Sequence, residues 1–209
     1  MTRVSPTPAT NDRIVWIDCE MTGLDLAADA LIEVAAVVTD SELTVLDGGI
    51  DVLIAPPAAA LEQMVPFVRD MHTSSGLLDA LADGLTMAEA TDAVLTYLRG
   101  HVEPRKAPLA GNSVGTDKAF LERDMPTLVD HLHYRVIDVS SIKELARRWY
   151  PRIYFASPEK AGGHRALADI LESIDELRYY RAAMMVPPPG PDSAEAKQIA
   201  EQVVATRYR

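Results

Sequence analysis

Cysteine is almost absent from this sequence, because Cys19 is the only one in 209 residues. A single cysteine cannot form a disulfide within the chain, which fits a reducing compartment. Residues 1–13 are polar and rich in proline and threonine, and they lack the apolar stretch of a signal peptide. Because the chain can form no internal disulfide and shows no signal peptide, we expect a cytoplasmic protein.

Long apolar runs and positive charge are scarce as well. No run of 18 apolar residues occurs, so we expect no membrane-spanning helix and no membrane partner. The net charge is −11, and residues 1–100 hold 4 Lys and Arg against 16 Asp and Glu, a net of −12. Residues 101–209 hold 16 against 15, a net of +1. Holding a long nucleic acid through its phosphates requires many cations, whereas a short oligonucleotide requires few.

Apolar residues make up 48% of the chain, enough for a large core, and the length suits one α/β domain. The patterning predicts strands at residues 13–18, 31–39, 43–54, 107–111 and 134–139. It predicts a helix that starts at Pro126, and others at residues 75–82, 87–98, 116–123, 141–149, 165–185 and 193–204. The first three strands suggest an antiparallel meander. The whole order predicts an α/β fold, with a mixed sheet of about five strands flanked by helices.

Four segments are expected to form turns, loops or a helix start between these elements. Residues 47–49 are expected to form a bulge or turn within the third strand. Residues 141–144 match a capping box, and residues 151–163 are rich in Pro, Gly and Ser, as expected of a loop. Residues 186–191 are expected to form a stiff proline-rich linker. We therefore expect a flexible N-terminus, one folded domain, and a linker with a short tail helix, at residues 1–12, 13–186 and 187–209.

Asp18 and Glu20 lie two residues apart at the end of the first predicted strand. On a strand this spacing directs both side chains to one face, while Cys19 points to the other. Neighbouring carboxylates on an otherwise apolar strand repel each other, and burying them is costly unless a cation is bound. A strand end that emerges into solvent at Thr22 and Gly23 would also explain the pair. The motif alone is therefore weak evidence for a metal site.

Asp117, His164 and Asp169 each have an ordinary explanation when taken singly. Asp117 suits the first turn of a helix, His164 follows two glycines in a loop, and Asp169 lies off the apolar stripe of its helix. Together with Asp18 and Glu20 they make four carboxylates and one histidine. Such a set favours the hard cations Mg²⁺ or Mn²⁺, two of which can clamp the attacking and leaving oxygens of a phosphodiester. The histidine is then free to act as a base.

The order and neighbours of these residues resemble the DEDDh family of 3′→5′ exonucleases, in particular its members that act on very short RNA. The similar segments are residues 16–24, 72–77, 111–113 with Asp117, 133–135 with 138–140, 143–149, and His164 with Asp169. The resemblance covers about residues 14–181 and is specific, because long motifs recur in the same order. It implies a ribonuclease H-like fold, in which residues 13–186 are an exonuclease domain.

The resemblance implies roles for the five residues of the acidic set. Asp18, Glu20 and Asp169 would ligate one divalent cation. Asp18 would also bridge to a second cation, with Asp117 close to it, directly or through water. His164 would take the proton of the attacking water.

The resemblance also implies contacts to short single-stranded RNA, above all to a dinucleotide. Leu24 would wedge between the two bases. Phe67 would stack on a base in the place where better-known members carry tryptophan, although it could instead be an ordinary core residue. The implied substrate-contacting residues are Met21, Thr22, Gly23, Leu24, Phe67, His72, Ser113, Tyr134, Arg135 and Ser140.

Two further pairs among these residues have assigned roles. Ser113 and Ser140 would cap the 5′ phosphate of the substrate. Tyr134 and Arg135 would reach across the interface of a homodimer to the substrate of the partner. Simpler interpretations also exist, because Ser140 could be a helix-entry residue and Tyr134 a strand-edge aromatic.

The preferred functional hypothesis is a 3′→5′ exoribonuclease that degrades short oligoribonucleotides to nucleoside 5′-monophosphates. A tRNA-trimming or DNA-proofreading relative is a second hypothesis, and it would need a basic surface for a long strand. The acidic net charge argues against that surface, although Lys143, Arg147, Arg148 and Arg152 could form a local basic patch. A catalytically silent interaction module is a third hypothesis. The presence of all five residues of the acidic set argues against it.

Overall fold

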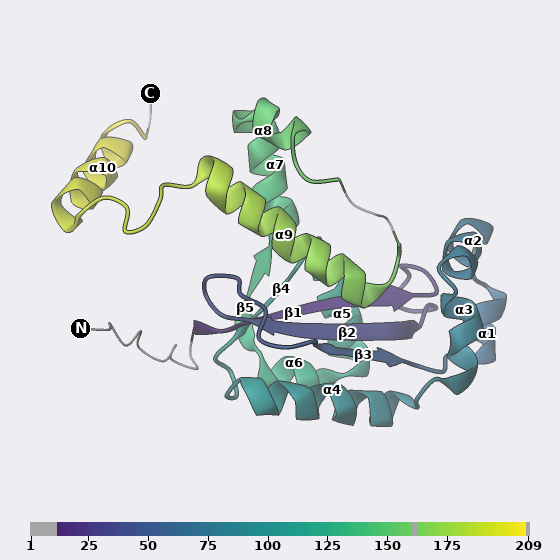
Figure 1. The fold of residues 1–209 in the computed structure, drawn as a ribbon. Helices are drawn as coiled ribbons and strands as arrows, with labels where there is room; N and C mark the ends of the chain where they lie inside the picture. The colour runs from purple at the N-terminus through teal and green to yellow at the C-terminus, as the bar shows by residue number, and fades with distance from the viewer. Residues whose placement is uncertain (1–11, 160–162, 208–209) are drawn as a thin grey trace.

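A computed structural model describes residues 12–159 and 163–207 of the chain. Its centre is a five-stranded sheet in the order β3-β2-β1-β4-β5 (Figure 1). β1 pairs antiparallel with β2, and β2 with β3, whereas β4 lies parallel to both β1 and β5. The predicted mixed sheet and its antiparallel meander are therefore confirmed. The strands are β1 (Ile14–Met21), β2 (Leu31–Thr39), β3 (Ile50–Leu53), β4 (Pro108–Gly111) and β5 (His133–Asp138).

Helices cover both faces of the sheet and form two separate apolar clusters with it (Figure 1). Val15, Ile17 and Cys19 of β1 belong to one cluster, and Trp16 belongs to the other. This alternation is the period of two expected of a strand, and it places Cys19 on the face opposite to Trp16. The first cluster is completed by α4 (Met87–His101), α5 (Gly115–Asp124) and α6 (Pro126–His131), and the second by α7 (Val139–Trp149) and α9 (Ala166–Met184).

The segment between β3 and α4 is more helical than its sequence predicted. It contains α1 (Ala58–Glu62), α2 (Pro66–Ser74), α3 (Leu77–Ala80) and the 3₁₀ helix η2 (Leu81–Asp83). Pro66 occupies the first turn of α2, where proline costs no hydrogen bond. Gly76, with φ of +74°, separates α2 from α3, so the helix predicted at residues 75–82 begins at Leu77 as α3 and continues as η2.

The third strand is shorter than predicted, because β3 comprises only residues 50–53, and Val45 adds no more than an isolated bridge to Thr39 of β2. Residues 40–49 form the connection instead. The Asp40 carboxylate accepts hydrogen bonds from the backbone N–H groups of Glu42 and Thr44, and Leu43 has φ of +68°. Hydrogen bonds to the Asp40 side chain thus form a turn in this segment, in place of continuous strand pairing.

Two predictions around the last helices are wrong. The capping box at residues 141–144 does not start α7, because the Asp138 side chain caps that helix by accepting from the Ser140 N–H. The loop predicted at residues 151–163 begins instead with α8 (Pro151–Phe155), again with proline in the first turn. Residues 160–162 of that segment lie outside the described residues.

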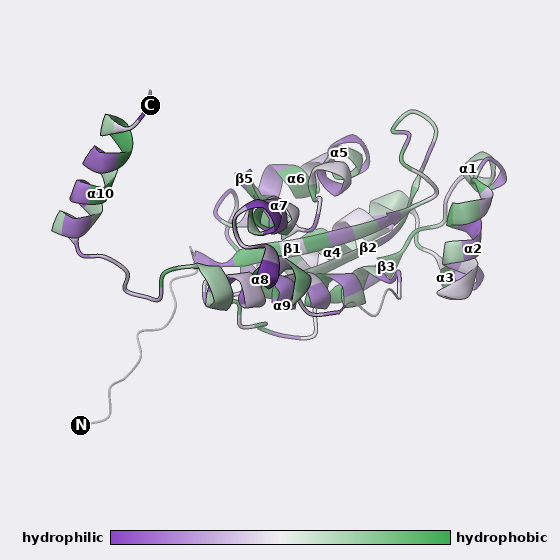
Figure 2. Ribbon diagram, turned by 90° about the horizontal axis from the view of Figure 1, so that it is seen from above, coloured by the Kyte–Doolittle hydropathy of each residue, from purple (hydrophilic) through white to green (hydrophobic). Residues whose placement is uncertain are grey.

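The long helix predicted at residues 165–185 is confirmed as α9, and the tail helix as α10 (Ser193–Ala205). A capping box formed by Asp192 and Glu195 starts α10. Figures 1 and 2 show α10 standing apart from the sheet, with hydrophobic and hydrophilic residues both on its surface, and none of its residues is buried. No helix in the described ranges is long and apolar enough to span a bilayer.

Candidate active site

The parallel strands β1, β4 and β5 end at one edge of the sheet (Figure 1). Asp18 and Glu20 lie near the end of β1, Ser113 follows β4, and Ser140 follows β5. Asp117 belongs to α5, the helix that comes directly after the β4 turn. Ligands of α/β proteins bind outside the carboxyl ends of parallel strands, where the loops converge. The fold thus collects polar residues from distant parts of the sequence at this edge.

Asp18 and Glu20 share the face of β1 that is covered by α9. In the antiparallel register, Asp18 lies opposite Ala35 and Glu20 opposite Glu33. Ala35 packs in the same cluster as α9, and Cys19 packs on the other face, as the spacing predicted. Asp169 lies in the first turn of α9. The helix therefore adds a third carboxylate to the two from the strand.

Burial and like charge strongly disfavour ionisation in this group. Burial first, and then the charges of Asp117, Glu20 and Asp169, raise the pKa of Asp18 to about 9. Burial, Asp169 and Glu33 together raise the pKa of Glu20 to about 8. Four carboxylates in one place cannot all be ionised at neutral pH without a compensating positive charge.

Asp117 is brought beside Asp18 by α5. Its side chain is 7% exposed, and its Oδ1 accepts a hydrogen bond of 3.0 Å from the backbone N–H of Cys19. Burial raises the pKa of Asp117 to about 6, although the hydrogen bonds from its own N–H and that of Cys19 act in the opposite direction. The hydrogen bond holds this carboxylate against β1.

The residues present fit a divalent cation. Ligand atoms of Glu20, His164 and Asp169 all lie within 4.8 Å of one another. The neighbouring Asp18 and Asp117 supply further carboxylate oxygens, the donors that Mg²⁺ and Mn²⁺ prefer. A cation here would relieve the repulsion that raises the pKa values of Asp18 and Glu20. His164 lies close enough to the acids to act either as a ligand or as a base.

His164 and Ser113 have unusual backbone conformations. Their φ angles are +47° and +53°, in the left-handed region that residues other than glycine seldom adopt. Such conformations persist where the surrounding structure holds them, and they concentrate at functional sites. His164 is exposed and lies immediately before the start of α9.

The structure reveals an ion pair between a half-exposed arginine and a buried carboxylate that the sequence did not suggest. Glu33 of β2 is fully buried, and both Nε and a terminal nitrogen of Arg165 lie 2.7 Å from its Oε1. Asp51 of β3 lies 3.5 Å from the same guanidinium. A carboxylate inside the apolar run of residues 31–38 was the available signal for this cluster.

Ser113 and Ser140 lie together, with 3.0 Å between their hydroxyl oxygens. Their backbone N–H groups both donate to Oδ1 of Asp138, at 3.0 and 2.9 Å. The Ser140 hydroxyl also donates to Oδ1 of Asn112, whose amide donates to Glu176. A polar network from three elements thus holds the serine pair that was predicted to contact phosphate.

Leu24 and Phe67 are 74% and 78% exposed, from the loop after β1 and from the first turn of α2. The exposure shows that Phe67 is not a core residue. A cavity of about 380 Å³ lies between Phe67 and His164, and it is lined also by Asp70, Met71, Ser74, Ser75 and Gly163. The exposed aromatic ring and the histidine therefore border one hollow.

Thr22 and Gly23 build the loop that presents Leu24. The Thr22 hydroxyl donates to Asp29 Oδ1 at 2.9 Å and accepts from the Ala30 N–H at 3.0 Å. A Cβ atom on Gly23 would lie 2.3 Å from Asp29 Oδ2, so a larger residue there would displace the Asp29 carboxylate that bonds Thr22. The structure thus shows a supporting role for these two predicted substrate contacts.

His72 and Met21 are buried rather than open to a ligand. His72 is fully buried, and its Nε2 lies 2.9 Å from the carbonyl oxygen of Met21, which is 9% exposed. His72 Nδ1 has no hydrogen-bond partner among the described residues and lies 3.9 Å from Glu20 Oε2. The buried ring therefore supports the end of β1 and lies beside Glu20 of the acidic cluster.

Tyr134 and Arg135 are not brought to the acidic cluster of their own chain. They lie near the start of β5, and the Arg135 guanidinium carbon is 5.5 Å from the centroid of the Tyr134 ring. Tyr134 is four residues before Asp138, roughly 13 Å along the strand. β5 is an edge strand, and Tyr134 is 76% exposed. Both side chains thus lie on an open flank of the molecule.

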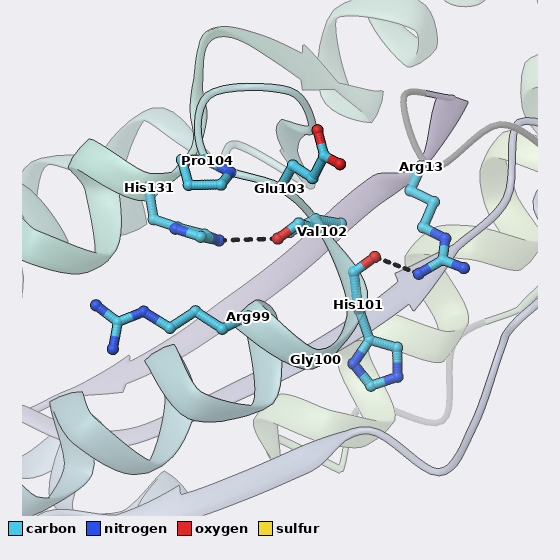
Figure 3. Close-up of a pocket in the computed structure, with 8 residues that line it drawn as sticks. All are labelled: Arg13, Arg99, Gly100, His101, Val102, Glu103, Pro104 and His131. Atoms are coloured by element: carbon cyan, nitrogen blue, oxygen red, sulfur yellow. Dashed lines mark hydrogen bonds between the residues drawn. The ribbon is translucent and has the colours of Figure 1, made fainter.

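A second hollow, of about 500 Å³, lies at the C-terminal end of α4 (Figure 3). The Arg13 guanidinium donates to the carbonyl of His101 there, and His131 Nε2 lies 3.1 Å from the carbonyl of Val102. Arg13 is seven residues before Glu20 on an extended strand, roughly 23 Å away. This hollow is therefore separate from the acidic cluster. Its lining residues are Arg13, Arg99, Gly100, His101, Val102, Glu103, Pro104 and His131.

A model of the exonuclease family RNase_T matches residues 15–177, a span that contains every residue of the acidic cluster. The chain belongs to this family of exonucleases, and it is a nuclease of the hydrolase class. It is 68% identical over 196 residues to oligoribonuclease from Streptomyces griseus. The aligned region covers 93% of this chain and 98% of that protein. It is 62% identical over 188 residues to oligoribonuclease from Cutibacterium acnes, covering 90% and 93%. Within the exonucleases, the chain belongs to the oligoribonuclease family.

Solved structures agree with the fold. Exonuclease I from Methylocaldum szegediense matches with a TM-score of 0.62 at 18% identity, over 82% of this chain and 41% of that one. Exonuclease I from E. coli in complex with a dT13 oligonucleotide matches with a TM-score of 0.62 at 16% identity, over 81% and 41%. The chain thus spans about two fifths of the length of these structures. The likeness confirms the ribonuclease H-like α/β fold predicted from the sequence.

Proposed function

We propose that this protein is a 3′→5′ exoribonuclease that hydrolyses short oligoribonucleotides, especially dinucleotides, to nucleoside 5′-monophosphates. The observation that carries the proposal is the cluster of Asp18, Glu20, Asp117, Asp169 and His164 at the carboxyl ends of β1 and β4. Membership of the oligoribonuclease family supports the same activity.

The residues suggest a mechanism that uses two divalent cations. Asp18, Glu20 and Asp169 would hold one cation, and Asp18 with Asp117 would hold the other. When bound, the two ions activate the attacking water and neutralise charge on the departing 3′ oxygen. His164 accepts the proton of that water as its oxygen attacks phosphorus, a step suited to an imidazole near neutral pH. The bond between phosphorus and the 3′ oxygen then breaks and releases the terminal nucleotide.

Short substrates are favoured by the surroundings of the cluster. The Ser113 and Ser140 pair would hold a 5′ phosphate, and Leu24 and Phe67 offer exposed apolar side chains to two bases. The basic patch that a long strand would require is partly neutralised, because Lys143 pairs with Glu176, and Glu144 pairs with Arg147 and Arg148. The overall charge of −11 also disfavours additional phosphates.

The test is hydrolysis of 5′-phosphorylated RNAs from two to about ten nucleotides long, a range over which single-strand binding modes differ. We expect the dinucleotide to be cleaved fastest, only with Mg²⁺ or Mn²⁺, and the preference to weaken without the 5′ phosphate. EDTA should abolish activity reversibly. Equal rates on long and short RNA would favour the processing-nuclease hypothesis, and activity in EDTA would contradict a metal mechanism.

We also propose a homodimer in which Tyr134 and Arg135 contact the substrate of the partner. Their position on an exposed edge strand, away from their own cluster, supports this arrangement. A two-fold contact would present each flank to the other copy. An arginine fork suits phosphate, and the tyrosine ring suits a base or a sugar.

The proposed exonuclease domain comprises residues 13–186. Its limits are supported by the family match over residues 15–177 and by the absence of buried residues in α10. Residues 187–209 would then be an appended linker and helix. The flexible N-terminus and the cytoplasmic location stay predictions.

A further inference from the structure

The buried carboxylate of Glu33 is not explained by the acidic cluster. Glu33 lies directly opposite Glu20 in the β1–β2 register, fully buried within the all-buried strand β2. Burying one more negative charge beside Glu20 is unfavourable in itself, and it raises the pKa of Glu20. A carboxylate retained at such a position needs an interaction that uses it.

Both oxygens of Glu33 are engaged by the two residues that follow His164. Oε1 lies 2.7 Å from two nitrogens of the Arg165 guanidinium, and Oε2 accepts a hydrogen bond of 3.0 Å from the Ala166 N–H. Asp51 Oδ2 lies 3.5 Å from the same terminal nitrogen of Arg165 that contacts Glu33. Carboxylates on two neighbouring strands thus hold the start of α9.

Arg165 is held through its backbone as well. It is the N-cap residue of α9, and its carbonyl accepts a hydrogen bond of 3.0 Å from the Asp169 N–H. Its side chain and its carbonyl therefore tie β2 to the first turn of the helix that carries Asp169. The residue before it, His164, has φ of +47°, a conformation that requires support from its surroundings.

We propose that Glu33 and Arg165 are positioning residues that hold the His164 imidazole against the acidic cluster. The proposal rests on the role of His164 as the base. Gly163 precedes His164 and restricts the backbone little, whereas Arg165 on its other side is held through both its side chain and its carbonyl. The ion pair restrains the histidine from that side, because an arginine fork on a buried carboxylate allows little rotation.

The test compares variants on a dinucleotide at saturating Mg²⁺ or Mn²⁺. Arg165→Ala should lower kcat by about 10–100-fold, the scale of a small misplacement of a catalytic group, with a much smaller change in KM. This variant leaves Glu33 unpaired and could fail to fold. Arg165→Lys keeps the charge but loses the fork, so it should fold and lower kcat by roughly tenfold. Melting curves check that each variant is folded.

Arg181→Ala is the matched control. Arg181 also lies on α9 and forms an ion pair of 2.6 Å, with Glu42, at the far end of the helix. Removing it takes away the same type of side chain and an ion pair of α9, here with the exposed carboxylate of Glu42. The kcat of this variant should equal that of the unmodified protein.

The decisive comparison repeats Arg165→Lys in a His164→Ala background. His164→Ala alone should lower kcat by about 10²–10⁴-fold, the usual contribution of a general base. If Arg165 acts through the imidazole, Arg165→Lys should have no further effect in that background. An equal loss in both backgrounds would overturn the proposal, as would a loss that is cured by excess metal. Unchanged kcat with a lower melting temperature would reduce the ion pair to a structural contact.

Failure of the proposed function gives a different result. If His164→Ala retains full kcat, the base assignment is wrong, and the inference for Arg165 falls with it. If His164→Ala is impaired but both Arg165 variants are fully active, only the positioning inference is overturned.

Discussion

At the scale of single residues, Asp18 combines burial with the repulsion of several carboxylates. Its pKa is raised to about 9 by burial first and by Asp117, Glu20 and Asp169 after that. The same side chain is expected to bridge two cations. In the proposed mechanism, Asp18 would therefore weaken the metal-free fold while serving the reaction, a conflict often found at functional sites.

Asp18→Ala should separate these two effects. We expect activity on a dinucleotide to fall by several orders of magnitude, the scale seen when catalytic groups are removed, because the cation ligands are incomplete. The melting temperature without metal should rise, by about 2–4 °C for each kcal/mol of repulsion relieved in a protein of this size. Initial rates and melting curves measure the two quantities. Full activity of the variant would contradict the two-cation mechanism.

At the scale of elements, the start of α7 joins helix capping to the predicted phosphate contact. Asp138 ends β5, caps α7 and accepts N–H hydrogen bonds from Ser113 and Ser140. One side chain thus connects two loops at the edge of the sheet. A change at this position should affect both stability and substrate binding.

Asp138→Ala should lower the free energy of unfolding by about 0.5–2 kcal/mol, as for other lost N-caps. It should also raise KM for a 5′-phosphorylated dinucleotide more than it lowers kcat, because the serine pair is released and the acidic cluster is not. Steady-state kinetics and denaturant titration measure these effects. Asp192→Ala, which removes the N-cap of the exposed helix α10, is the control and should leave KM unchanged. An unaltered KM in Asp138→Ala would argue against the phosphate contact.

At the scale of the whole molecule, the proposed dimer divides each site between two copies. Asp18→Ala protein and Tyr134→Ala/Arg135→Ala protein should each be nearly inactive alone. After subunit exchange, a hybrid dimer has one site with both defects and one with neither. Activity should therefore recover toward half that of the unmodified dimer per hybrid. No recovery despite confirmed exchange would place Tyr134 and Arg135 within their own chain or away from the substrate.

The stability of the whole molecule should also depend on pH and metal together. Burial raises the pKa of Asp18 from 3.8 to about 9 and that of Glu20 from 4.5 to about 8. An acid with a raised folded-state pKa stabilises the fold below its unfolded pKa, and this contribution is lost as pH rises through the folded value. The melting temperature in EDTA should therefore fall as pH increases across the window from 4 to 9.

Mg²⁺ or Mn²⁺ should reverse this loss. The increase in melting temperature on adding metal should be larger at the upper end of the window, because protons no longer compete for the carboxylates. Asp18→Asn should weaken the dependence on both pH and metal. A melting temperature that responds to neither variable would contradict the raised pKa values and the cation site.

Local sequence patterns were sufficient to predict those elements whose tertiary contacts favour the same secondary structure. The apolar run of β2, the helical stripe of α9 and the amphipathic pattern of the tail helix all depend on residues close in sequence, so their positions could be predicted. The third strand and the segments after Pro57 and Pro151 could not. Residues 151–163 were interpreted as a loop from their Pro, Gly and Ser content, yet Pro151 starts α8. Pro66 starts α2 in the same way, in a segment for which no helix was predicted before residue 75.

The sequence by itself predicted the chemistry of the site, because the order and neighbours of its acidic motifs resemble those of the DEDDh exonucleases. Asp18, Glu20, Asp117, His164 and Asp169 could thus be named before any fold was known. Only the tertiary structure decided which groups surround them. Glu33 meets Arg165 across 132 positions, and Asn112 meets Glu176 across 64. Such partners depend on strand pairing and helix packing, so no spacing pattern in the sequence predicts them.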